Sequence, residues 1–304
     1  AVSIYILIPL LLVPMLLLGG AMIKFDDLHK SITKKVYVPV IGDFMVTRWS
    51  YEALMVEEYK NNKFEKPFFK YDMEISRTGW YNSFLLPMLK VKVEECRVAG
   101  RNPDFEENAR NNFRKLNYHL KELAAETGIS RGAWFSDLNY EKFNESVSNQ
   151  AKSYIDSLAI FIRARNKSMV ESKDSLLKAI VAIMGEQAFQ KQREADYNET
   201  LADIVLNRLG TIKIYETEKK LLQKADPVLM PPGSQYGRAH FYAPFKKLGN
   251  TRIDTLLFNT GAIWLMTIVL FVTLYLDVLK RFVFFLESLR IPIWRKFGRE
   301  LLPV

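Results

Sequence analysis

The sequence predicts an all-α membrane protein in which two transmembrane helices flank a re-entrant or interfacial helix and a large extracytoplasmic helical bundle. Two apolar runs, residues 1–23 and 256–276, contain no charged residue. A bilayer core of about 30 Å needs roughly 20 apolar residues in a helix, so both runs are long enough to cross it. Much of the chain between them repeats apolar residues at spacings of three and four, which is typical of amphipathic helices. The predicted parts are a first span, an external loop with the re-entrant helix, an external helical domain, a second span and a basic amphipathic tail, at residues 1–24, 25–64, 65–251, 252–279 and 280–304.

The first apolar run is predicted to be a span rather than a signal peptide. It has no basic n-region and no small-residue cleavage pattern, and it is longer than a typical signal-peptide core. Pro9, Pro14 and the pair Gly19 and Gly20 would kink a helix, but spans tolerate such residues where neighbouring helices cover the freed backbone groups. The sequence begins inside this apolar run with Ala1 instead of an initiator Met, so we expect a piece of a longer polypeptide or a trimmed one.

The basic residues after the second run predict the orientation of the chain. Short loops rich in Lys and Arg stay in the cytoplasm, whereas long loops cross the membrane largely regardless of charge. The tail is therefore expected in the cytoplasm and residues 25–255 outside it. The basic residues of the tail are Lys280, Arg281, Arg290, Arg295, Lys296 and Arg299.

Charge and cysteine content limit the partners and the compartment. The net charge of +9 is spread over both the tail and the insert, so it predicts no acidic partner and no nucleic-acid partner. Cys96 is the only cysteine, which excludes an internal disulfide and a thiolate metal cluster. An external domain of this size without disulfides fits a bacterial envelope.

The segment after the first span predicts a helix close to the membrane. Asp43 or Thr47 can cap a helix that continues to Tyr59. Trp49 shares one face of this helix with other apolar residues at helical spacing. Such an apolar, aromatic-rich helix either lies at the outer interface or dips into the membrane under cover of other helices.

The insert is predicted to be a bundle of antiparallel helices. Glycine and proline clusters at residues 100–103, 128–132 and 210 mark the connections. A polar connector is expected first, and an ordered Pro/Gly-rich loop at 226–250 returns the chain to the membrane. The expected helices lie at residues 80–98, 103–126, 139–164, 170–209 and 211–224, after a connector at 61–78. A last helix, at residues 280–302, is expected along the cytoplasmic face.

No motif in the sequence predicts catalysis or metal binding. The chain contains no G-x-x-x-x-G-K-[ST] loop, no H-E-x-x-H and no G-x-S-x-G. Its three histidines, His29, His119 and His240, are far apart in sequence. Apart from tyrosines, neither apolar run carries an ionisable side chain, which argues against a proton relay. We therefore expect no catalytic residue, metal ligand or cofactor-binding residue in this chain.

Residues 9–64 resemble the end of the fifth span and the following external loop of ABC-2 type permeases, specifically the subfamily-G-like exporters. That family has a proline in the span, a small-residue break, an acidic F-D-D-L-type segment and a P-x-I segment followed by R-Y/W-x-x-E-A-L. The closing span with a short basic tail resembles the family's sixth span. The matching residues are Pro14, Gly19, Gly20, Phe25, Asp26, Asp27, Leu28, Pro39, Ile41, Arg48, Trp49, Tyr51, Glu52, Ala53, Leu54, Glu58 and Tyr59.

The resemblance implies ATP-driven export of a hydrophobic or amphipathic substrate across a bacterial inner membrane. ATP and Mg²⁺ would bind a nucleotide-binding domain outside this sequence, on the same longer chain or on a partner subunit. The pathway would lie between two permease halves in a homodimer or pseudo-dimer embedded in lipid. Arg48 and Glu52, at i and i+4, are expected to pair. The candidate pathway and gate residues are Pro14, Gly19, Gly20, Phe25, Pro39, Arg48, Trp49, Tyr51, Glu52 and Leu54.

The chain departs from the family pattern in three ways. The nucleotide-binding domain and the first four spans are missing, the external insert is far larger than usual, and the paired loop cysteines of eukaryotic members are absent. The enlarged, disulfide-free loop is expected of a bacterial, Bacteroidetes-type member. We expect the insert to dock an envelope protein. The alternative function is a two-span envelope scaffold or sensor whose helical domain binds a partner protein.

Overall fold

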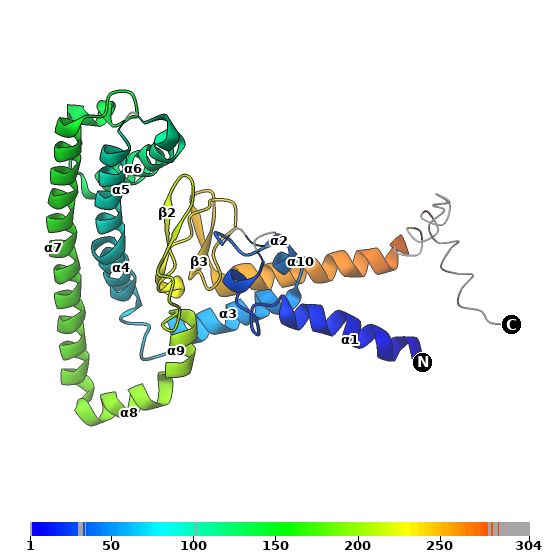
Figure 1. Ribbon diagram of the computed structural model, residues 1–304. Helices are drawn as coiled ribbons and strands as arrows, with labels where there is room; N and C mark the ends of the chain where they lie inside the picture. The colour runs from blue at the N-terminus through cyan, green and yellow to red at the C-terminus, as the bar shows by residue number, and fades with distance from the viewer. Residues whose placement is uncertain are drawn as a thin grey trace.

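The computed structural model describes residues 2–29, 33, 35–100, 102–278, 281 and 285, and it is mostly helical. A helical domain built from α4 to α8 forms one end of the molecule, and the apolar helices α1 and α10 extend from the other end (Figure 1). Two short β-hairpins and α9 lie between these parts. The α-helices are α1 (Val2–Leu17), α2 (Val40–Asp43), α3 (Val46–Asn61), α4 (Phe69–Trp80), α5 (Leu86–Ala99), α6 (Glu106–Thr127), α7 (Glu145–Met184), α8 (Glu186–Asp196), α9 (Glu199–Val205) and α10 (Thr255–Tyr275).

Shorter elements complete the chain. A π-helical turn joins α4 to α5, and short 3-10 turns occur in the connections. Strands β1 and β2 pair antiparallel, as do β3 and β4. The 3-10 turns are Phe25–Asp27, Pro103–Phe105, Ala133–Asp137 and Pro227–Leu229, the π turn is Tyr81–Leu85, and the strands are Ile214–Glu216, Leu221–Gln223, Phe245–Leu248 and Thr251–Asp254.

The helical domain is held by one apolar core. The 40-residue helix α7 begins after Asn144, whose side chain accepts a hydrogen bond from the backbone of Val147 at 3.0 Å. This N-cap satisfies one of the free amide groups at the helix start. The first half of α7 then buries a face at three-and-four spacing against α4, α5 and α6. Its main buried residues are Ala151, Ile155, Leu158 and Ile162.

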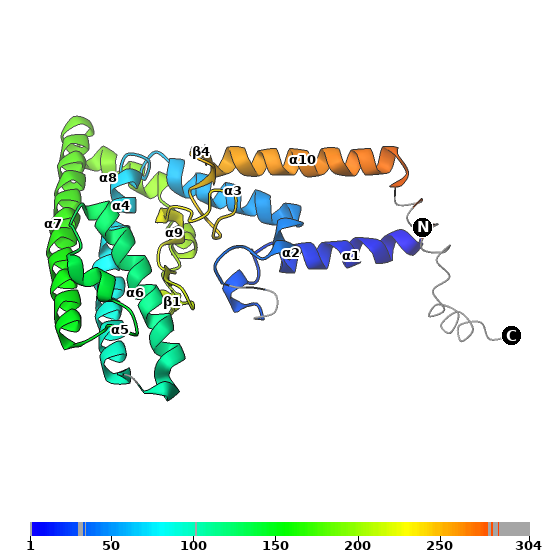
Figure 2. The ribbon, with the colours of Figure 1, turned by 90° about the horizontal axis from the view of Figure 1, so that it is seen from above.

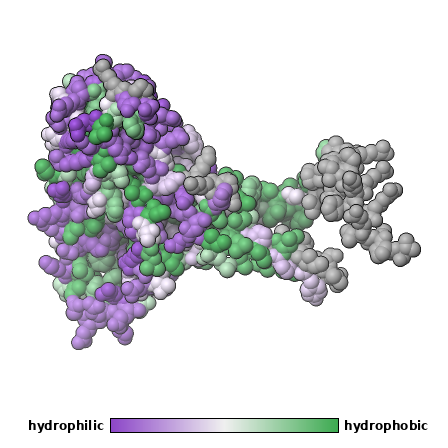
Figure 3. Space-filling view, in the orientation of Figure 1, coloured by the Kyte–Doolittle hydropathy of each residue, from purple (hydrophilic) through white to green (hydrophobic). Residues whose placement is uncertain are grey.

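The other end of the molecule has an apolar outer surface. Helices α1 and α10 both extend away from the helical domain, and α3, which contacts both, lies along the first half of α10 (Figure 2). In the space-filling view, apolar residues cover this stalk while hydrophilic residues cover most of the helical domain (Figure 3). A smaller apolar core, which includes Val56, Leu201 and Val228, joins α3 to α9 and to the turn that follows β2.

The helical class is confirmed, but the all-α expectation is wrong in detail because four short strands occur. The helix expected at residues 211–224 is instead the β1–β2 hairpin. A tertiary contact contributes to this outcome, because the backbone N–H of Leu221 donates to Nε2 of the buried His119 at 2.8 Å. The loop expected at 226–250 contains a 3-10 turn and all of β3.

Several predicted boundaries also move. The connector expected at 61–78 ends at Phe69, where α4 begins and continues through the π turn into α5. The single helix expected at 170–209 is three helices, broken at Gly185, whose φ is +81°, and again before α9. The helix expected at 280–302 lies outside the described residues apart from Arg281 and Phe285.

One predicted span has a helix of sufficient length. Among the described residues, α10 is the one helix long and apolar enough to cross a membrane. The first apolar run is helical over Val2–Leu17, a stretch of 16 residues, and then turns. Gly20 follows with φ +80°, a backbone conformation that favours glycine, so the helix does not continue through the expected span to residue 24.

Candidate functional site

Helix α3 and, far from it in sequence, strand β3 and helix α10 each contribute polar side chains to one buried cluster. We call Arg48, Glu52, Lys246 and Asn259 the α3–α10 cluster. Their side chains are fully or almost fully buried. Buried charges are rare unless they are paired, so this cluster is the most unusual polar feature of the apolar end of the molecule.

Glu52 is the centre of the α3–α10 cluster. Lys246 Nζ donates to its Oε1 at 2.6 Å, and Asn259 Nδ2 donates to its Oε2 at 2.9 Å. The same Asn259 amide also donates to the backbone carbonyl of Trp49 at 3.0 Å. Arg48 Nη1 lies 3.4 Å from Glu52 Oε2, so the i, i+4 pair expected from the sequence is present. Strand β3 and helix α10 are thereby joined to α3 through one carboxylate.

The Arg48 guanidinium has a second carboxylate partner at the edge of the cluster. Its Nη2 lies 3.7 Å from Oδ1 of Asp43, which is partly exposed. The guanidinium also lies over the Trp49 ring, 3.9 Å from the ring centroid. Trp49 is held in turn, because its Nε1 donates to the backbone carbonyl of Asp43 at 2.8 Å. Trp49 therefore positions the cation rather than contacting the Glu52 carboxylate.

The electrostatics favour an ionised Glu52. Burial alone would raise the pKa of Glu52, but Arg48 and Lys246 outweigh it and hold the pKa below its ordinary value. Burial lowers the pKa of Lys246, and the Glu52 charge opposes that shift. Burial raises the pKa of Asp43 despite the attraction of Arg48. The cluster thus contains two cations and one carboxylate, and Asp43 offsets part of the excess positive charge from the edge. Because these ions are buried and paired with one another, the cluster supports positioning of helices.

Some polar atoms of the cluster are not satisfied. Among the described residues, Arg48 Nε and Nη1 and Asn259 Oδ1 are buried without a hydrogen-bond partner. Such atoms carry an energetic cost that a tightly packed helix pair must offset. The α3–α10 contact is therefore strong only while Glu52 keeps both of its cations.

Other predicted residues gather where α1 ends. Gly20, Phe25 and Tyr51 all line one cavity. The rings of Phe25 and Phe241 meet edge to face with centroids 4.9 Å apart, and Tyr51 stacks on Phe241 at 6.3 Å. The structure therefore divides the predicted residues into the α3–α10 cluster and an aromatic cavity.

Gly19 lies where α1 approaches the start of α3. A Cβ atom at Gly19 would lie 2.7 Å from the Met15 carbonyl oxygen and 2.8 Å from Thr47 Oγ1. Thr47 Oγ1 itself donates to the Met15 carbonyl at 2.6 Å. Only glycine allows this approach without a shift of one of the two helices.

The remaining predicted residues are not brought into either group. Pro14 lies within α1, and Pro39 is the residue that precedes α2. Leu54 is 66% exposed on the outer face of α3. Sequence reasoning missed Lys246 and Asn259. The sequence offers only a lysine in the loop expected at 226–250 and an amide inside an apolar run.

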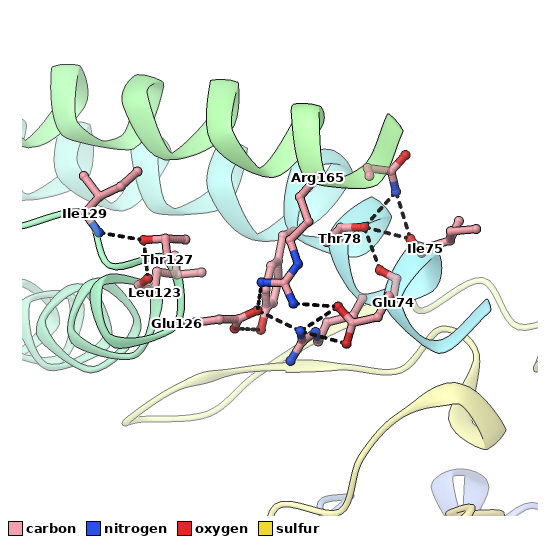
Figure 4. Close-up of polar contacts among 11 residues, drawn as sticks. Glu74, Ile75, Thr78, Leu123, Glu126, Thr127, Ile129 and Arg165 are labelled. Carbon is pink, nitrogen blue, oxygen red and sulfur yellow. Dashed lines mark hydrogen bonds and ion pairs between the residues drawn. The ribbon is translucent and has the colours of Figure 1, made fainter. Parts of the chain in front are cut away.

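The helical domain contains a second polar network, which we call the bundle network: Glu74, Arg77, Glu126 and Arg165. Figure 4 shows Glu74 and Arg165 meeting between α4 and α7, with Glu126 of α6 beside them. Each arginine lies within 4 Å of both carboxylates, with separations of 2.8 to 3.7 Å. The four side chains are 24–34% exposed, so this network lies at the edge of the domain core.

The described residues contain no group of three or more His, Cys, Asp or Glu side chains that could hold a metal ion. Cys96, the single cysteine, is buried, and burial raises its pKa to about 12, which disfavours the reactive thiolate. Comparisons with protein-family models, with curated proteins and with solved structures each found no match.

Proposed function

We propose that this chain forms the last two spans and the external domain of the permease half of an ATP-driven exporter, which moves a hydrophobic or amphipathic substrate across a bacterial inner membrane. The observation that supports this proposal is the fold of residues 39–59, the segment that resembles ABC-2 type permeases. This segment packs against both apolar helices and is joined to α10 by the α3–α10 cluster. ATP and Mg²⁺ belong in this proposal to a nucleotide-binding domain outside the 304 residues, where a phosphate loop would hold them.

The surface of α10 supports a place in lipid. Its 21 residues span about 31 Å at about 1.5 Å per residue, which matches a hydrocarbon core of about 30 Å. Trp264, Leu265 and Phe271 are each more than 60% exposed, so the helix is not the core of a soluble domain. An exposed apolar surface of this length is stable when lipid or other apolar helices cover it.

The direction of α3 supports a re-entrant helix. Lys60, near its end, forms an ion pair with Asp254 at the start of α10, whereas Glu52 meets Asn259 further along. Helix α3 is therefore antiparallel to α10, and its first turn lies deepest along the stalk, beside the end of α1. The turn before α3 exposes apolar side chains, which the outer leaflet covers in this proposal: Val40, Ile41 and Phe44.

The exposed face of α3 fits a pathway between two halves. Leu54 projects from this face, while Arg48 and Glu52 are buried on the other side. In the proposed dimer, a second permease half faces Leu54, and the α3–α10 cluster fixes the helix that closes the outer end of the pathway. The role of the cluster is then mechanical, because it keeps α3 and α10 moving together.

The polypeptide that carries this sequence provides the test. Its intact denatured mass and its peptides upstream of Ala1 would be measured, together with any ATPase that co-purifies. We expect upstream peptides with a phosphate-binding loop and four further spans, or a separate ATPase subunit. A polypeptide with neither upstream spans nor an associated ATPase contradicts the exporter.

A two-span envelope scaffold or sensor is the second candidate, and the exposed apolar side chains of α7 favour it. Ile160 is 68% exposed and Ile183 is 87% exposed, so the helical domain offers apolar contacts to another envelope protein. Replacing residues 70–195 by a short Gly/Ser linker removes most of this domain but keeps α9 and Lys246. Loss of a co-purifying envelope protein would support docking by the domain, and unchanged partners would contradict it.

A further inference from the structure

A cavity of about 360 Å³ opens where α1 ends, and we call it the outer cavity. The chain after α1 forms one wall, the β2 strand and the residues after it form a second, and the loop before β3 forms a third. Small-molecule sites usually have volumes of about 300 to 1,000 Å³, so a ligand of modest size fits. Gly20, Phe25 and Tyr51 place it next to the α3–α10 cluster without including the cluster itself.

The lining is largely apolar and aromatic. Phe241 is central, because it contacts the rings of Phe25, Tyr51 and Tyr242 at centroid distances between 4.3 and 6.3 Å. Aliphatic side chains such as Leu222 and Met230 add to the apolar surface. An apolar chain of a ligand would replace water against these rings, which is favourable in proportion to the area covered.

The charged side chains of the lining are mostly cationic. Four lysines line the outer cavity, against a single carboxylate, Asp26. Lys224 Nζ already holds both oxygens of Asp26, at 2.8 and 2.9 Å. Among the described residues, the other three lysines have no carboxylate partner, so three ammonium groups remain available for an anion: Lys24, Lys35 and Lys220.

The contacts of these three lysines are weak ones. Lys24 Nζ lies 3.4 Å from Asn207 Oδ1. Lys35 and Lys220 lie 6.0 and 5.8 Å from the centroids of aromatic rings, at the outer limit of a cation–π contact. A charge-assisted hydrogen bond to an anionic group is stronger than any of these contacts.

The backbone around the cavity is adapted to keep the rings in place. Gly20 has φ +80°, and a Cβ atom there would lie 2.7 Å from ring atoms of both Phe25 and Phe241. Tyr242 has φ +67°, a conformation that a bulky residue rarely adopts. Strain of this kind persists where the surrounding structure requires it and is concentrated at functional sites.

We propose that the outer cavity binds an amphiphile with one anionic head group and an apolar chain. The aromatic floor holds the chain, and Lys24, Lys35 and Lys220 hold the phosphate or carboxylate of the head group. This inference rests on the lining alone and does not require the chain to be an exporter, because binding needs no ATP. It differs from the pathway between two permease halves, since all of its residues come from one chain.

The test measures binding of dodecyl phosphate to the full-length protein by native mass spectrometry from dodecyl maltoside micelles. The neutral detergent has the same alkyl chain, and inorganic phosphate presents the head group alone. The test variant carries Lys24→Gln and Lys220→Gln. The matched control carries Lys63→Gln and Lys219→Gln, which remove the same charge from exposed lysines outside the cavity.

We expect dodecyl phosphate to bind the wild type in preference to either control compound. The Lys24→Gln, Lys220→Gln variant should bind at least about tenfold more weakly, and the matched control within about twofold of wild type. Equal affinity in all three proteins, or an equal loss in both variants, would overturn the proposal. Inorganic phosphate that binds as tightly as dodecyl phosphate would also overturn it, because the apolar chain would then contribute nothing.

A second test variant keeps every lysine and reduces only the volume of the outer cavity. Met230→Trp adds a bulky ring to the cavity lining and should prevent dodecyl phosphate from binding, while the melting temperature shows whether the variant is folded. Undiminished binding to a folded Met230→Trp protein would contradict a site in this cavity.

Discussion

The two ends of the molecule bury charge in different ways. In the α3–α10 cluster one carboxylate, Glu52, serves two cations, and all three side chains are almost completely shielded from water. In the bundle network two arginines and two carboxylates form every possible cross pair, and each side chain remains partly exposed. The first arrangement has one carboxylate between its two buried cations, whereas in the second each of the two carboxylates contacts both arginines.

This difference determines where the molecule is sensitive to substitution. A buried ion that loses its partner retains its desolvation cost and gains nothing in return. A partly exposed ion that loses one of two partners is solvated by water or keeps the other partner. The apolar stalk is therefore expected to depend on single residues, and the helical domain on its core rather than on its ion pairs.

The largest effect is expected for Glu52→Gln. This change leaves the charge of Lys246 buried without its carboxylate and leaves Arg48 with only Asp43 at the edge of the cluster, so the free energy of unfolding should fall by about 3 to 5 kcal/mol. Thermal unfolding of the protein in detergent micelles measures it. Glu58→Gln, an exposed position on the same helix, is the control and should change stability by less than about 0.5 kcal/mol. Equal effects of the two substitutions would remove the distinction between the regions.

Acidification should lower the stability that the helical domain gains from His119 without affecting the Glu52 ion pairs of the α3–α10 cluster. Burial, with a smaller contribution from Lys220, lowers the pKa of His119 to about 4, so folding excludes its proton. The stability that comes from neutral His119 is complete above the unfolded value of 6.5 and is lost as pH falls from there towards 4. Between pH 7 and pH 5 this loss is about 2 kcal/mol.

The same pH change leaves Glu52 ionised. Its folded pKa is lowered, so its contribution is present above the unfolded value and is lost only as pH falls through the folded value. Denaturant unfolding at pH 7 and pH 5 checks the prediction. His119→Gln keeps an acceptor for the Leu221 amide and should remove the His119 part of the pH dependence, leaving that of His240, whose pKa burial also lowers to about 4. A pH dependence unchanged by His119→Gln would show that the acid-sensitive group lies elsewhere.

An intermediate effect is expected for Gly20→Ala. The new Cβ would meet the rings of Phe25 and Phe241 in a backbone conformation with φ +80°, so stability should fall by about 1 to 2 kcal/mol. Gly249→Ala is the control, because it has φ +59° but nothing within 4 Å of its Cβ. The difference between the two melting temperatures isolates the cost of the ring contacts. If the two variants lose the same stability, the backbone conformation alone accounts for it.

The smallest effect is expected for Glu74→Gln in the bundle network. Arg77 and Arg165 both keep Glu126, so the free energy of unfolding should fall by less than about 1 kcal/mol. The double substitution of Glu74 and Glu126 by Gln removes both carboxylates and should cost more than the sum of the single changes. Additive costs would show that the two carboxylates do not replace each other.

Local patterns were sufficient to predict the long helices and the pair on α3. The three-and-four spacing of Ala151, Ile155 and Leu158 marks the buried face of α7, and the i, i+4 spacing of Arg48 and Glu52 brings them together. Both features depend on one helix and its own periodicity. The gate role of these residues, like the first span at residues 1–24, stays a prediction.

The features that the sequence did not predict depend on contacts between segments that are distant in the chain. Lys246 and Lys247 are neighbours in one strand, and only the packing of β3 on α3 decides that Lys246 is buried. Asn259 is one amide in an apolar helix until the fold places Glu52 beside it. The β1–β2 hairpin is equally dependent, because each strand has three residues and a long-range bond to His119 contributes to its position. No local pattern contains this information.

The junction between the two regions has an evolutionary consequence. Lys60 lies in the last turn of α3, and the chain returns beside it at Pro244, whose carbonyl accepts a hydrogen bond from Lys60 Nζ at 3.4 Å. Lys60 also pairs with Asp254, where α10 begins. Departure and return therefore occupy one place, which is the geometry of an inserted domain. Over generations, the parts of this 183-residue segment that do not pack on α3 can be lengthened, shortened or exchanged while the stalk keeps its shape, so they are free to diverge faster than the stalk.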